Sequence, residues 1–415
     1  MKRTLHGLGP RLLFYSHDTY GLGHFRRTLA IADAIARRCP SVSMLCATGS
    51  PRSHSFPMPS NFDVVKLPSS TKDEQGEYTA RSLDISFDRL VEMRSRLLLE
   101  TARAYRPDLV LVDHSPAGMA GELRPMLEAV RRDLPAAALW LGLRDVIDEP
   151  SRVRDEWTRG RLFPLVSEVY HRIFVYGVEK VYDLPREYGW PASLRSRLTF
   201  TGFVHDGGPR STPREVRRQL GLKRRPLVAV TVGGGGDGDR LLRSLAQALR
   251  RDPRPQFDCV VLTGPLLSES KRGRLEARLH RTKGVQTLAF HEDVPALFAA
   301  ADLVVSMGGY NSVVEILAFA RRGLVAPRTF PRLEQSVRAN RLAELGWIES
   351  LPDDAPEPEE LRARIERALA SAAARPGLLS EHLDGAERMA AEVEKALLSP
   401  QPFPSAPMAA AGAPR

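Results

Sequence analysis

Short runs of β-branched and aliphatic residues alternate along the chain with longer stretches in which apolar residues recur every three or four positions. The short runs are typical of buried strands and the longer stretches of amphipathic helices, so this order indicates parallel α/β units. In the first half we expect strands near Leu12–Ser16, Val42–Ala47, Val64–Leu67, Leu109–Asp113, Ala138–Leu143, Ile173–Tyr176 and Leu198–Thr201. Helices are expected, among others, at His24–Arg38, Ser82–Tyr105 and Gly121–Asp133.

The pattern breaks at residues 205–213, where two glycines and two prolines predict a linker. The alternation then resumes, with strands expected at Leu227–Val232, Asp258–Leu262, Val285–Phe290, Leu303–Met307 and Gly323–Ala326. The helices expected between and after them are Asp239–Arg250, Glu269–His280, Val294–Ala301, Ser312–Ala320 and Glu334–Leu345, and a last helix is expected at Leu378–Leu398.

A chain of 415 residues that is 43% hydrophobic is too long for one ordinary core, so we predict two domains. The fold class is α/β, with two Rossmann-like, doubly wound domains facing a central cleft. Residues 1–205 form the first domain, 206–226 the linker and domain start, and 227–377 the second domain. Residues 378–398 form a helix expected to pack back toward the first domain, and the Pro- and Ala-rich residues 399–415 are expected to be disordered.

The composition of the chain argues against several classes of protein. Three isolated cysteines, Cys39, Cys46 and Cys259, support neither a disulfide framework nor a zinc site, so we expect no metal and a reducing cytoplasm. No run of about 18 apolar residues predicts a spanning helix. The net charge of +10 is scattered and lacks a nucleic-acid-binding motif, so no nucleic-acid partner is expected. The charge reflects either an Arg-rich host proteome, which we prefer, or attraction to the inner face of a membrane.

The strongest chemical signal follows the strand expected at Leu303–Met307. Gly308, Gly309, Tyr310 and Asn311 lead directly into the helix that begins at Ser312. A strand, a glycine turn and a helix direct free N–H groups and the positive end of the helix dipole toward one point, where a diphosphate can bind. Glu315, expected on the first helical turn, could accept hydrogen bonds from a ribose. The alternative is an ordinary tight connection.

Other loops of the second domain should reach the same edge of the sheet. Phe290, His291 and Val294 end the preceding strand and suit a nucleotide base. Gly234 and Gly264 belong to two further glycine-containing turns. After the strand at Gly323–Ala326, a loop and helix start carry residues suited to phosphate and sugar hydroxyls, namely Arg328, Arg332, Glu334 and Gln335.

Three motifs of the second domain resemble those of a known family. FHEDV at 290–294, DLVVSMGGYNSVVEIL at 302–317 and PRTFPRLEQ at 327–335 resemble the donor-binding domain of family 28 glycosyltransferases, whose fold is GT-B. The resemblance implies that Gly309 to Ser312 hold the diphosphate of a nucleotide-sugar donor and that Glu315 binds the ribose. It also implies that Glu334 and Gln335 bind the sugar and that His291 faces the base through its backbone. The sugar nucleotide is then a substrate, and no cofactor is expected.

The first domain opens with a strand, a glycine loop containing Gly21 and Gly23, and a helix that begins near His24. The motif SHDTYGLGHFRRTLAIADAIA at 16–36 resembles the N-terminal signature of predicted bacterial glycosyltransferases, and in family 28 a glycine loop ending in His occupies the same place. His24 is a candidate base because a neutral imidazole can accept a hydroxyl proton. A helix N-terminus lowers its pKa, which suits a hydrogen-bond donor better, and a capping or packing role is the alternative.

Asp113, His114 and Ser115 end another strand of the first domain and should lie at the same rim. Asp113 could pair with His24, serve as the base itself, or cap the loop. His17, Asp18 and Arg144 follow two further strands. The candidate acceptor contacts are these three residues together with Gly21, Gly23, His114 and Ser115. The first loop departs from the all-glycine form of family 28, so the peptidoglycan acceptor is not expected to transfer. A glycan, a lipid-linked compound and a small molecule all fit.

The sequence therefore predicts an inverting, metal-independent glycosyltransferase, with UDP-sugars favoured as donors. Three rivals remain open. A nucleotide-sugar 2-epimerase has the same fold and donor class. An oxidoreductase would use the glycine loop at 233–238, but no acidic partner about 20 residues on is apparent. A sugar-nucleotide-binding protein without catalysis would not need His24.

Overall fold

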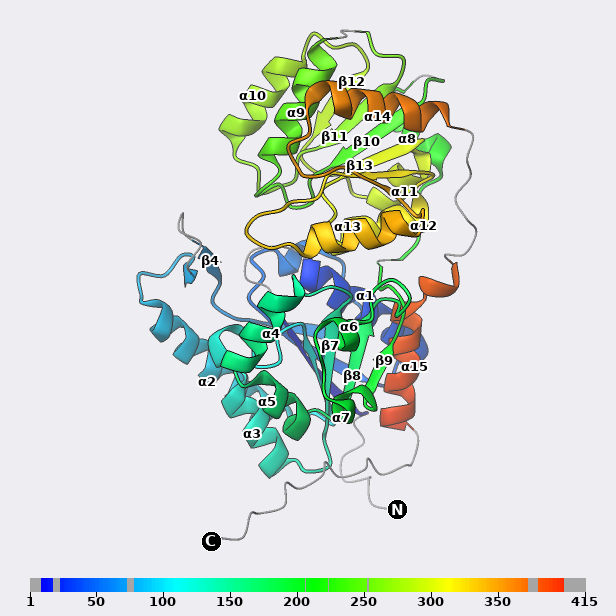
Figure 1. The fold of residues 1–415 in the computed structure, drawn as a ribbon. Coiled ribbons are helices and arrows are strands. Elements are labelled where there is room, and N and C mark those ends of the chain that lie inside the picture. Colours follow the sequence, from blue (N-terminus) through cyan, green and yellow to red (C-terminus); the bar gives the residue numbers. More distant parts are fainter. Residues whose placement is uncertain are drawn as a thin grey trace.

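The computed structural model describes residues 9–17, 23–72, 78–205, 207–222, 224–251, 254–371 and 380–398. Over these residues the chain forms two α/β domains, one above the other in Figure 1, joined through the green segment that follows the first sheet. This confirms the predicted fold class. The tail expected at 399–415 lies outside the described residues.

The first domain is built on a parallel sheet whose described strands run in the order β3-β2-β1-β6-β7-β8-β9. The strands are β1 (Arg11–Ser16), β2 (Ser43–Thr48), β3 (Phe62–Lys66), β6 (Leu109–Asp113), β7 (Ala138–Arg144), β8 (Arg172–Tyr176) and β9 (Leu198–Phe200). The helices are α1 (Gly23–Arg38), α2 (Phe87–Tyr105), α3 (Arg124–Asp133), α4 (Pro150–Arg159), α5 (Leu162–Val169), α6 (Leu184–Glu187) and α7 (Ala192–Arg195). A short antiparallel pair, β4 (Ser70–Lys72) and β5 (Tyr78–Ala80), precedes α2.

The second domain repeats the plan, with described strands in the order β12-β11-β10-β13-β14-β15. The strands are β10 (Leu227–Thr231), β11 (Asp258–Leu262), β12 (Val285–Leu288), β13 (Leu303–Ser306), β14 (Gly323–Val325) and β15 (Glu349–Ser350). The helices are α8 (Pro213–Gln219), α9 (Asp239–Arg250), α10 (Glu269–Leu279), α11 (Val294–Ala300), α12 (Tyr310–Phe319), α13 (Glu334–Glu344) and α14 (Pro358–Ala370).

Helices cover both faces of each sheet, which is why the central strands are apolar at almost every position. In the second sheet, Val228 and Val230 pack with α9, α10 and α14, whereas Leu227 and Ala229 pack with α11 and α12 on the other face. The second of these layers belongs to one apolar cluster with α1 of the first domain. The two domains thus share part of an apolar core in this arrangement.

The last helix, α15 (Gly385–Leu398), returns to the first domain and lies along α1 (Figure 1). Met389 and Val393 belong to the same apolar cluster as α1, and Arg37 and Arg38 of α1 form ion pairs with Glu387 and Glu394. The helix therefore follows the second domain in the sequence and packs on α1 of the first domain. No described helix is both long and apolar enough to cross a bilayer.

Three helix starts differ from the sequence prediction, and a capping side chain explains the first of them. The helix predicted from Ser82 begins at Phe87, since Ser86 caps the N–H of Arg89 at 3.3 Å. The helix predicted from Gly121 begins at Arg124, and the one predicted from Leu378 begins, within the described residues, at Gly385.

Near the candidate donor turn the differences affect the site. The strand predicted to reach Phe290 ends at Leu288, so Phe290 lies in a loop. Helix α12 begins at Tyr310 rather than Ser312, because Gly309 is its N-cap. Glu315 is consequently on the second turn of this helix and not on the first.

Candidate functional site

Both sheets reverse their strand order at one point, and the two reversals face each other across the domain boundary. In the first sheet β1 lies between β2 and β6, and in the second β10 lies between β11 and β13. Loops that leave neighbouring strands at such a point diverge to opposite faces and leave a crevice for ligands. His24 follows β1, Asp113 ends β6, and the Gly308–Gly309 turn follows β13.

The turn after β13 exposes the N-terminus of α12. Gly308 has φ +87°, and an added Cβ would lie 2.8 Å from Val325, so this position requires glycine. Gly309 is the N-cap, and a Cβ there would meet no described atom within 4 Å. No side chain caps this end of the helix. The first-turn N–H groups, including those of Asn311 and Ser312, therefore point toward open space, as an anion site requires.

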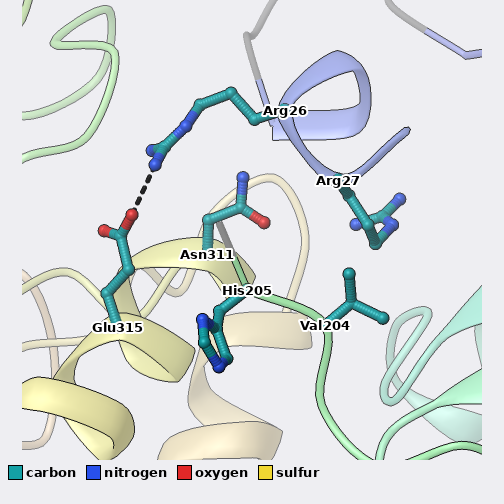
Figure 2. A pocket seen from close by; sticks show the side chains of 6 residues that line it. All are labelled: Arg26, Arg27, Val204, His205, Asn311 and Glu315. Atoms are coloured by element: carbon teal, nitrogen blue, oxygen red, sulfur yellow. Dashed lines mark hydrogen bonds and ion pairs between the residues drawn. The ribbon is translucent and has the colours of Figure 1, made fainter. Parts of the chain in front are cut away.

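Glu315 is buried and forms an ion pair with Arg26 from α1 of the other domain. One turn before it on α12, Asn311 donates a hydrogen bond to the Gly23 carbonyl at 3.1 Å. Figure 2 shows Arg26 reaching past Asn311 to Glu315, with His205 and Val204 on the opposite side of the pocket. This pocket has a volume of about 10 Å³, room for about one water molecule. The carboxylate that we predicted to bind the ribose is therefore paired with an arginine of the other domain.

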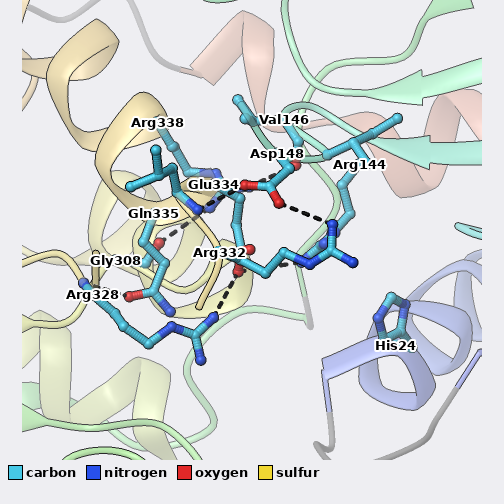
Figure 3. A network of polar contacts seen from close by, with 12 residues as sticks. His24, Arg144, Val146, Asp148, Gly308, Arg328, Arg332, Glu334, Gln335 and Arg338 are labelled. Atoms are coloured by element: carbon cyan, nitrogen blue, oxygen red, sulfur yellow. Dashed lines mark hydrogen bonds and ion pairs between the residues drawn. The ribbon is translucent and has the colours of Figure 1, made fainter. Parts of the chain in front are cut away.

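The predicted sugar-binding pair, Glu334 and Gln335, lies at the start of α13 and is buried (Figure 3). Gln335 Oε1 accepts a hydrogen bond from the Arg328 N–H at 3.0 Å, and Glu334 Oε1 accepts one from Arg328 Nη2 at 3.2 Å. Arg144 of the first domain also approaches this pair, with its Nη1 3.9 Å from Glu334 Oε1.

Arg332, predicted to contact the donor, instead pairs with the first domain in this structure. Its guanidinium lies 2.9 Å from Asp148 Oδ2 and 2.9 Å from Glu156 Oε1. The neighbouring Leu333 N–H donates to the other oxygen of Asp148 at 2.7 Å. The loop that carries the sugar-binding pair is thus held by the first domain.

The residues predicted to face the base and the phosphates lie in several loops and turns of the second domain. The side chain of Phe290 is 60% exposed, and His291 Nδ1 accepts the Asp293 N–H at 3.1 Å. Val294 starts α11. Gly234 and Gly264 are pressed together, because a Cβ on Gly264 would lie 2.4 Å from the Gly234 carbonyl carbon. The absence of a side chain therefore allows the two loops that carry these glycines to pack against each other.

His24 and Asp113 meet, as the sequence allowed. His24 Nδ1 lies 2.5 Å from Asp113 Oδ2 and 2.9 Å from Arg27 Nη2. With the proton on Nδ1, the imidazole donates to the carboxylate and Nε2 is the proton-accepting atom; with the proton on Nε2, Nδ1 accepts from the guanidinium. Arg27, one turn along α1, donates to both oxygens of Asp113 at 2.7 and 2.8 Å. Burial raises the pKa of Asp113, and Arg27 opposes this rise. The two hydrogen bonds from Arg27 hold the carboxyl group in place.

Two more histidines surround this pair. The ring of His114 lies 4.9 Å from that of His24, and His17 lies 5.8 Å from it on another side. His114 has φ +69°, a left-handed backbone conformation that few residues other than glycine adopt. Burial, helped by Arg27 and Arg144, lowers the pKa of His24 well below its ordinary value. Burial likewise lowers the pKa of His17 to about 4 and that of His114. All three imidazoles are neutral near pH 7.

Two polar atoms at this rim have no hydrogen-bond partner among the described residues, His114 Nδ1 and Arg144 Nε. Both are buried atoms of predicted acceptor contacts. Ser115, by contrast, hydrogen-bonds the Gly118 carbonyl at 2.9 Å and shapes its own turn. Asp18 and Gly21 lie outside the described residues, and Gly23 is the first residue of α1.

Sequence reasoning missed the arginines that organise the site. Arg27 follows His24 at a spacing of three, which places both on one helical face, and this spacing is the signal that could have identified it. Arg338 and Asp145 form a bidentate pair, with both side chains at most 1% exposed, that joins α13 to the loop after β7. Arg338 also donates to the Gly308 carbonyl at 3.2 Å. No local pattern predicts this pair.

Comparison with known proteins gives a family match for the second domain. Residues 228–389 match the family model of the glycosyltransferase family 28 C-terminal domain. A UDP-N-acetylglucosamine--N-acetylmuramyl-(pentapeptide) pyrophosphoryl-undecaprenol N-acetylglucosamine transferase from Rubrobacter xylanophilus is 30% identical over 161 residues, which is 37% of this chain and 43% of that protein. The chain thus spans less than half the length of this curated relative. An uncharacterised glycosyltransferase from Methanosarcina mazei is 24% identical over 79% of this chain and 82% of its own.

Solved structures extend the likeness to the whole chain at the level of the fold. The calicheamicin glycosyltransferase CalG4 superposes with a TM-score of 0.63, 18% identity, and coverage of 95% of this chain and 100% of that one. A protein from Listeria monocytogenes that bears the name of UDP-N-acetylglucosamine 2-epimerase gives a TM-score of 0.64, 13% identity, and coverage of 95% and 98%. The chain has the GT-B fold, and this fold alone does not separate transferase from epimerase.

Proposed function

We propose that this chain, which carries a family 28 glycosyltransferase C-terminal domain, transfers a sugar from a nucleoside-diphosphate sugar to an acceptor hydroxyl. One observation carries the proposal. The N-terminus of α12, which no side chain caps, faces the His24–Asp113 pair of the other domain. The two lie where the strand orders of the two sheets reverse. A donor held on one side would present its anomeric carbon to a base on the other.

On the donor side, the turn from Gly308 to Ser312 binds the diphosphate through N–H groups and the helix dipole. Glu315 binds the ribose, and Glu334 with Gln335 binds the sugar. UDP is the favoured nucleotide because the relative from Rubrobacter xylanophilus is named for a UDP-sugar. Phe290 is an exposed ring on which the base can stack, near His291 and Val294.

On the acceptor side, His24 Nε2 takes the proton of the attacking hydroxyl, and Asp113 holds the imidazole in the required tautomer. The acceptor oxygen forms a bond to the anomeric carbon on the face opposite the diphosphate, the bond from that carbon to the β-phosphate oxygen breaks, and the configuration inverts. Backbone N–H groups and arginine stabilise the leaving diphosphate without a metal ion. His17, His114 and Arg144 contact the acceptor.

A panel of nucleotide sugars tests the proposal. We expect UDP and at least one UDP-sugar to raise the melting temperature, and we expect slow hydrolysis of that donor to follow. Glu315→Ala should weaken donor binding about tenfold or more, with the fold unchanged by circular dichroism. If no nucleotide sugar shifts the melting temperature, the proposal fails. Conversion of the free donor to its 2-epimer, without transfer, would identify an epimerase instead.

A further inference from the structure

A buried chain of hydrogen bonds connects α2 to the rim at which the histidines lie, and it passes through Tyr15 near the end of β1. Arg94 of α2 donates to both oxygens of Glu122, through Nε at 2.6 Å and Nη2 at 2.7 Å. The Tyr15 hydroxyl lies 2.7 Å from Glu122 Oε1 and 3.3 Å from His17 Nδ1. The arginine, the glutamate and the tyrosine are each at most 1% exposed, and the proposed chemistry uses none of them.

The Tyr15 phenol has one proton to donate, and Glu122 accepts it. Both oxygens of Glu122 are hydrogen-bond acceptors toward Arg94, so a hydroxyl 2.7 Å from Oε1 must be a donor. Burial raises the pKa of Tyr15 well above its ordinary value, with Glu122 adding to the rise, so the phenol keeps its proton. Toward every other neighbour the phenol oxygen is an acceptor, as it is for the Met119 N–H at 3.3 Å.

The same count of protons places the proton of His17. Because the Tyr15 hydroxyl cannot also donate to the imidazole, the hydrogen bond at 3.3 Å requires a proton on His17 Nδ1. Burial lowers the pKa of His17 to about 4, so the ring is neutral near pH 7 and carries only this one N–H. Nε2 therefore carries a lone pair, and the described residues offer this atom no hydrogen bond.

This lone pair belongs to the cluster of histidines around the proposed base. The ring of His17 lies 5.8 Å from that of His24 and 5.7 Å from that of His114. A compound bound between these rings can therefore meet His17 Nε2. Because a lone pair accepts a hydrogen bond, it suits a hydroxyl group and disfavours the oxygens of a phosphate or a carboxylate.

We infer that Tyr15 is a positioning residue of the acceptor site, which holds His17 so that Nε2 accepts a hydrogen bond from the incoming hydroxyl compound. This inference rests on the proposed function and adds Tyr15 to it. With a sugar as acceptor, His24 takes the proton of the reacting hydroxyl while His17 binds a second hydroxyl beside it. With water, in slow hydrolysis of the donor, the oxygen bonds to the anomeric carbon and the diphosphate leaves. One proton of that water passes to His24, and His17 accepts a hydrogen bond from the other O–H.

Nitrogen NMR of protein with isotope-labelled histidine measures the tautomer directly and needs no substrate. The wild-type signals of His17, identified by their absence in His17→Asn, should show a protonated Nδ1 and an unprotonated Nε2 at neutral pH. In Tyr15→Phe the acceptor for the Nδ1 proton is gone, so we expect this proton to move wholly or partly to Nε2. A wild-type His17 with its proton on Nε2 would overturn the inference.

Hydrolysis of the donor tests whether this tautomer matters for the reaction. Tyr15→Phe keeps the aromatic ring and the Arg94–Glu122 pair. We expect its kcat to fall about three- to tenfold, as for the loss of one hydrogen bond, with an unchanged KM for the UDP-sugar. His17→Asn should lower kcat at least as far. In the His17→Asn background, Tyr15→Phe should have no further effect on kcat, because Tyr15 acts through His17.

Tyr105→Phe is the matched control, because it removes a phenol hydroxyl that donates to the Ser43 carbonyl at 2.8 Å, at the opposite end of the same sheet. It should change neither the His17 signals nor kcat. If Tyr15→Phe lowers kcat equally with and without His17, Tyr15 only stabilises the fold and the inference is wrong. Unchanged kcat in Tyr15→Phe also contradicts it. If the wild-type chain hydrolyses no nucleotide sugar, the proposed function fails and the role of Tyr15 with it, whatever tautomer NMR finds.

Discussion

At the scale of single residues, the His24–Asp113 pair is the centre of the proposed chemistry. Replacing His24 by Asn removes the proton acceptor, and replacing Asp113 by Asn removes the group that fixes the imidazole tautomer. We expect either change to lower kcat about 10²- to 10⁴-fold while UDP affinity stays within about twofold. The exposed His280→Asn on α10 serves as the control. A His24→Asn variant with normal kcat would exclude His24 as the base.

The buried surroundings of His24 predict an unusual pH profile. The base must be neutral to act, and burial lowers the pKa of His24 below 6.5, with Arg27 and Arg144 adding to the effect. The protonated form therefore accumulates only at lower pH, and kcat/KM should stay level from pH 7.5 to below 6.5 before it falls. His17, His114 and Asp113 face the same imidazole.

Replacing Arg144 by a neutral residue tests the direction in which this arginine shifts the pKa of His24. Arg144→Gln deletes a cation that disfavours the imidazolium, so the pKa of His24 should rise and the acidic limb of kcat/KM should move to higher pH. Rate measurements between pH 4.5 and 8 in both proteins check this shift. An acidic limb at the same pH in both would mean that another group controls the profile.

Residue positions at strand ends were predictable, and side-chain partners across elements were not. His24 and Asp113 follow strands that the pattern placed side by side, so their pairing could be anticipated. Arg26 and Arg27 lie on a helix whose polar positions looked like an ordinary solvent face. Their partners, Glu315 and Asp113, come from elements far away in sequence. The binding and catalytic roles of all these residues stay predictions.

At the scale of elements, the donor turn offers two neighbouring glycines with different constraints. Gly308→Ala puts a Cβ at φ +87° and 2.8 Å from Val325, so it should lower the melting temperature. Gly309→Ala meets open space at φ −58° and should leave the melting temperature unchanged. Its methyl group would nevertheless stand where the diphosphate approaches α12, so UDP affinity should fall. Thermal unfolding and calorimetric titration separate the two effects, and unchanged UDP affinity in Gly309→Ala would move the diphosphate elsewhere.

Elements with strong periodicity were predicted to the residue, as at Leu109–Asp113, Asp258–Leu262 and Asp239–Arg250. Errors arose where a single capping side chain sets the boundary, as Ser86 does for α2. Helix α14 (Pro358–Ala370) was not anticipated, since prolines and acidic residues before it resemble a loop. Local hydrogen bonds, rather than the hydrophobic pattern, decide such details.

At the scale of the whole molecule, the sequence predicted two domains and a cleft but could not predict how tightly they meet. The pocket at the boundary has a volume of only about 10 Å³, room for about one water molecule, whereas typical ligand sites hold roughly 300–1,000 Å³. A nucleotide sugar can therefore enter only after the domains part. Opening must break the contacts that Arg332, Arg338 and Arg26 make with the other domain.

Among these contacts, the Arg338–Asp145 pair should dominate, because both side chains are almost fully buried. Asp145→Ala leaves a buried guanidinium without its carboxylate, so we expect a loss of about 3–5 kcal/mol in unfolding free energy. Because water can solvate Arg338 when the domains separate, the variant should also show a larger radius of gyration in solution scattering. Combining Asp145→Leu with Arg338→Met should recover most of the stability, since no buried charge remains. Glu387→Ala, which breaks an exposed pair on α15, should change neither quantity. If Asp145→Ala has the same free energy of unfolding as Glu387→Ala and the wild-type radius of gyration, the shared apolar core holds the closed arrangement and this ion pair does not.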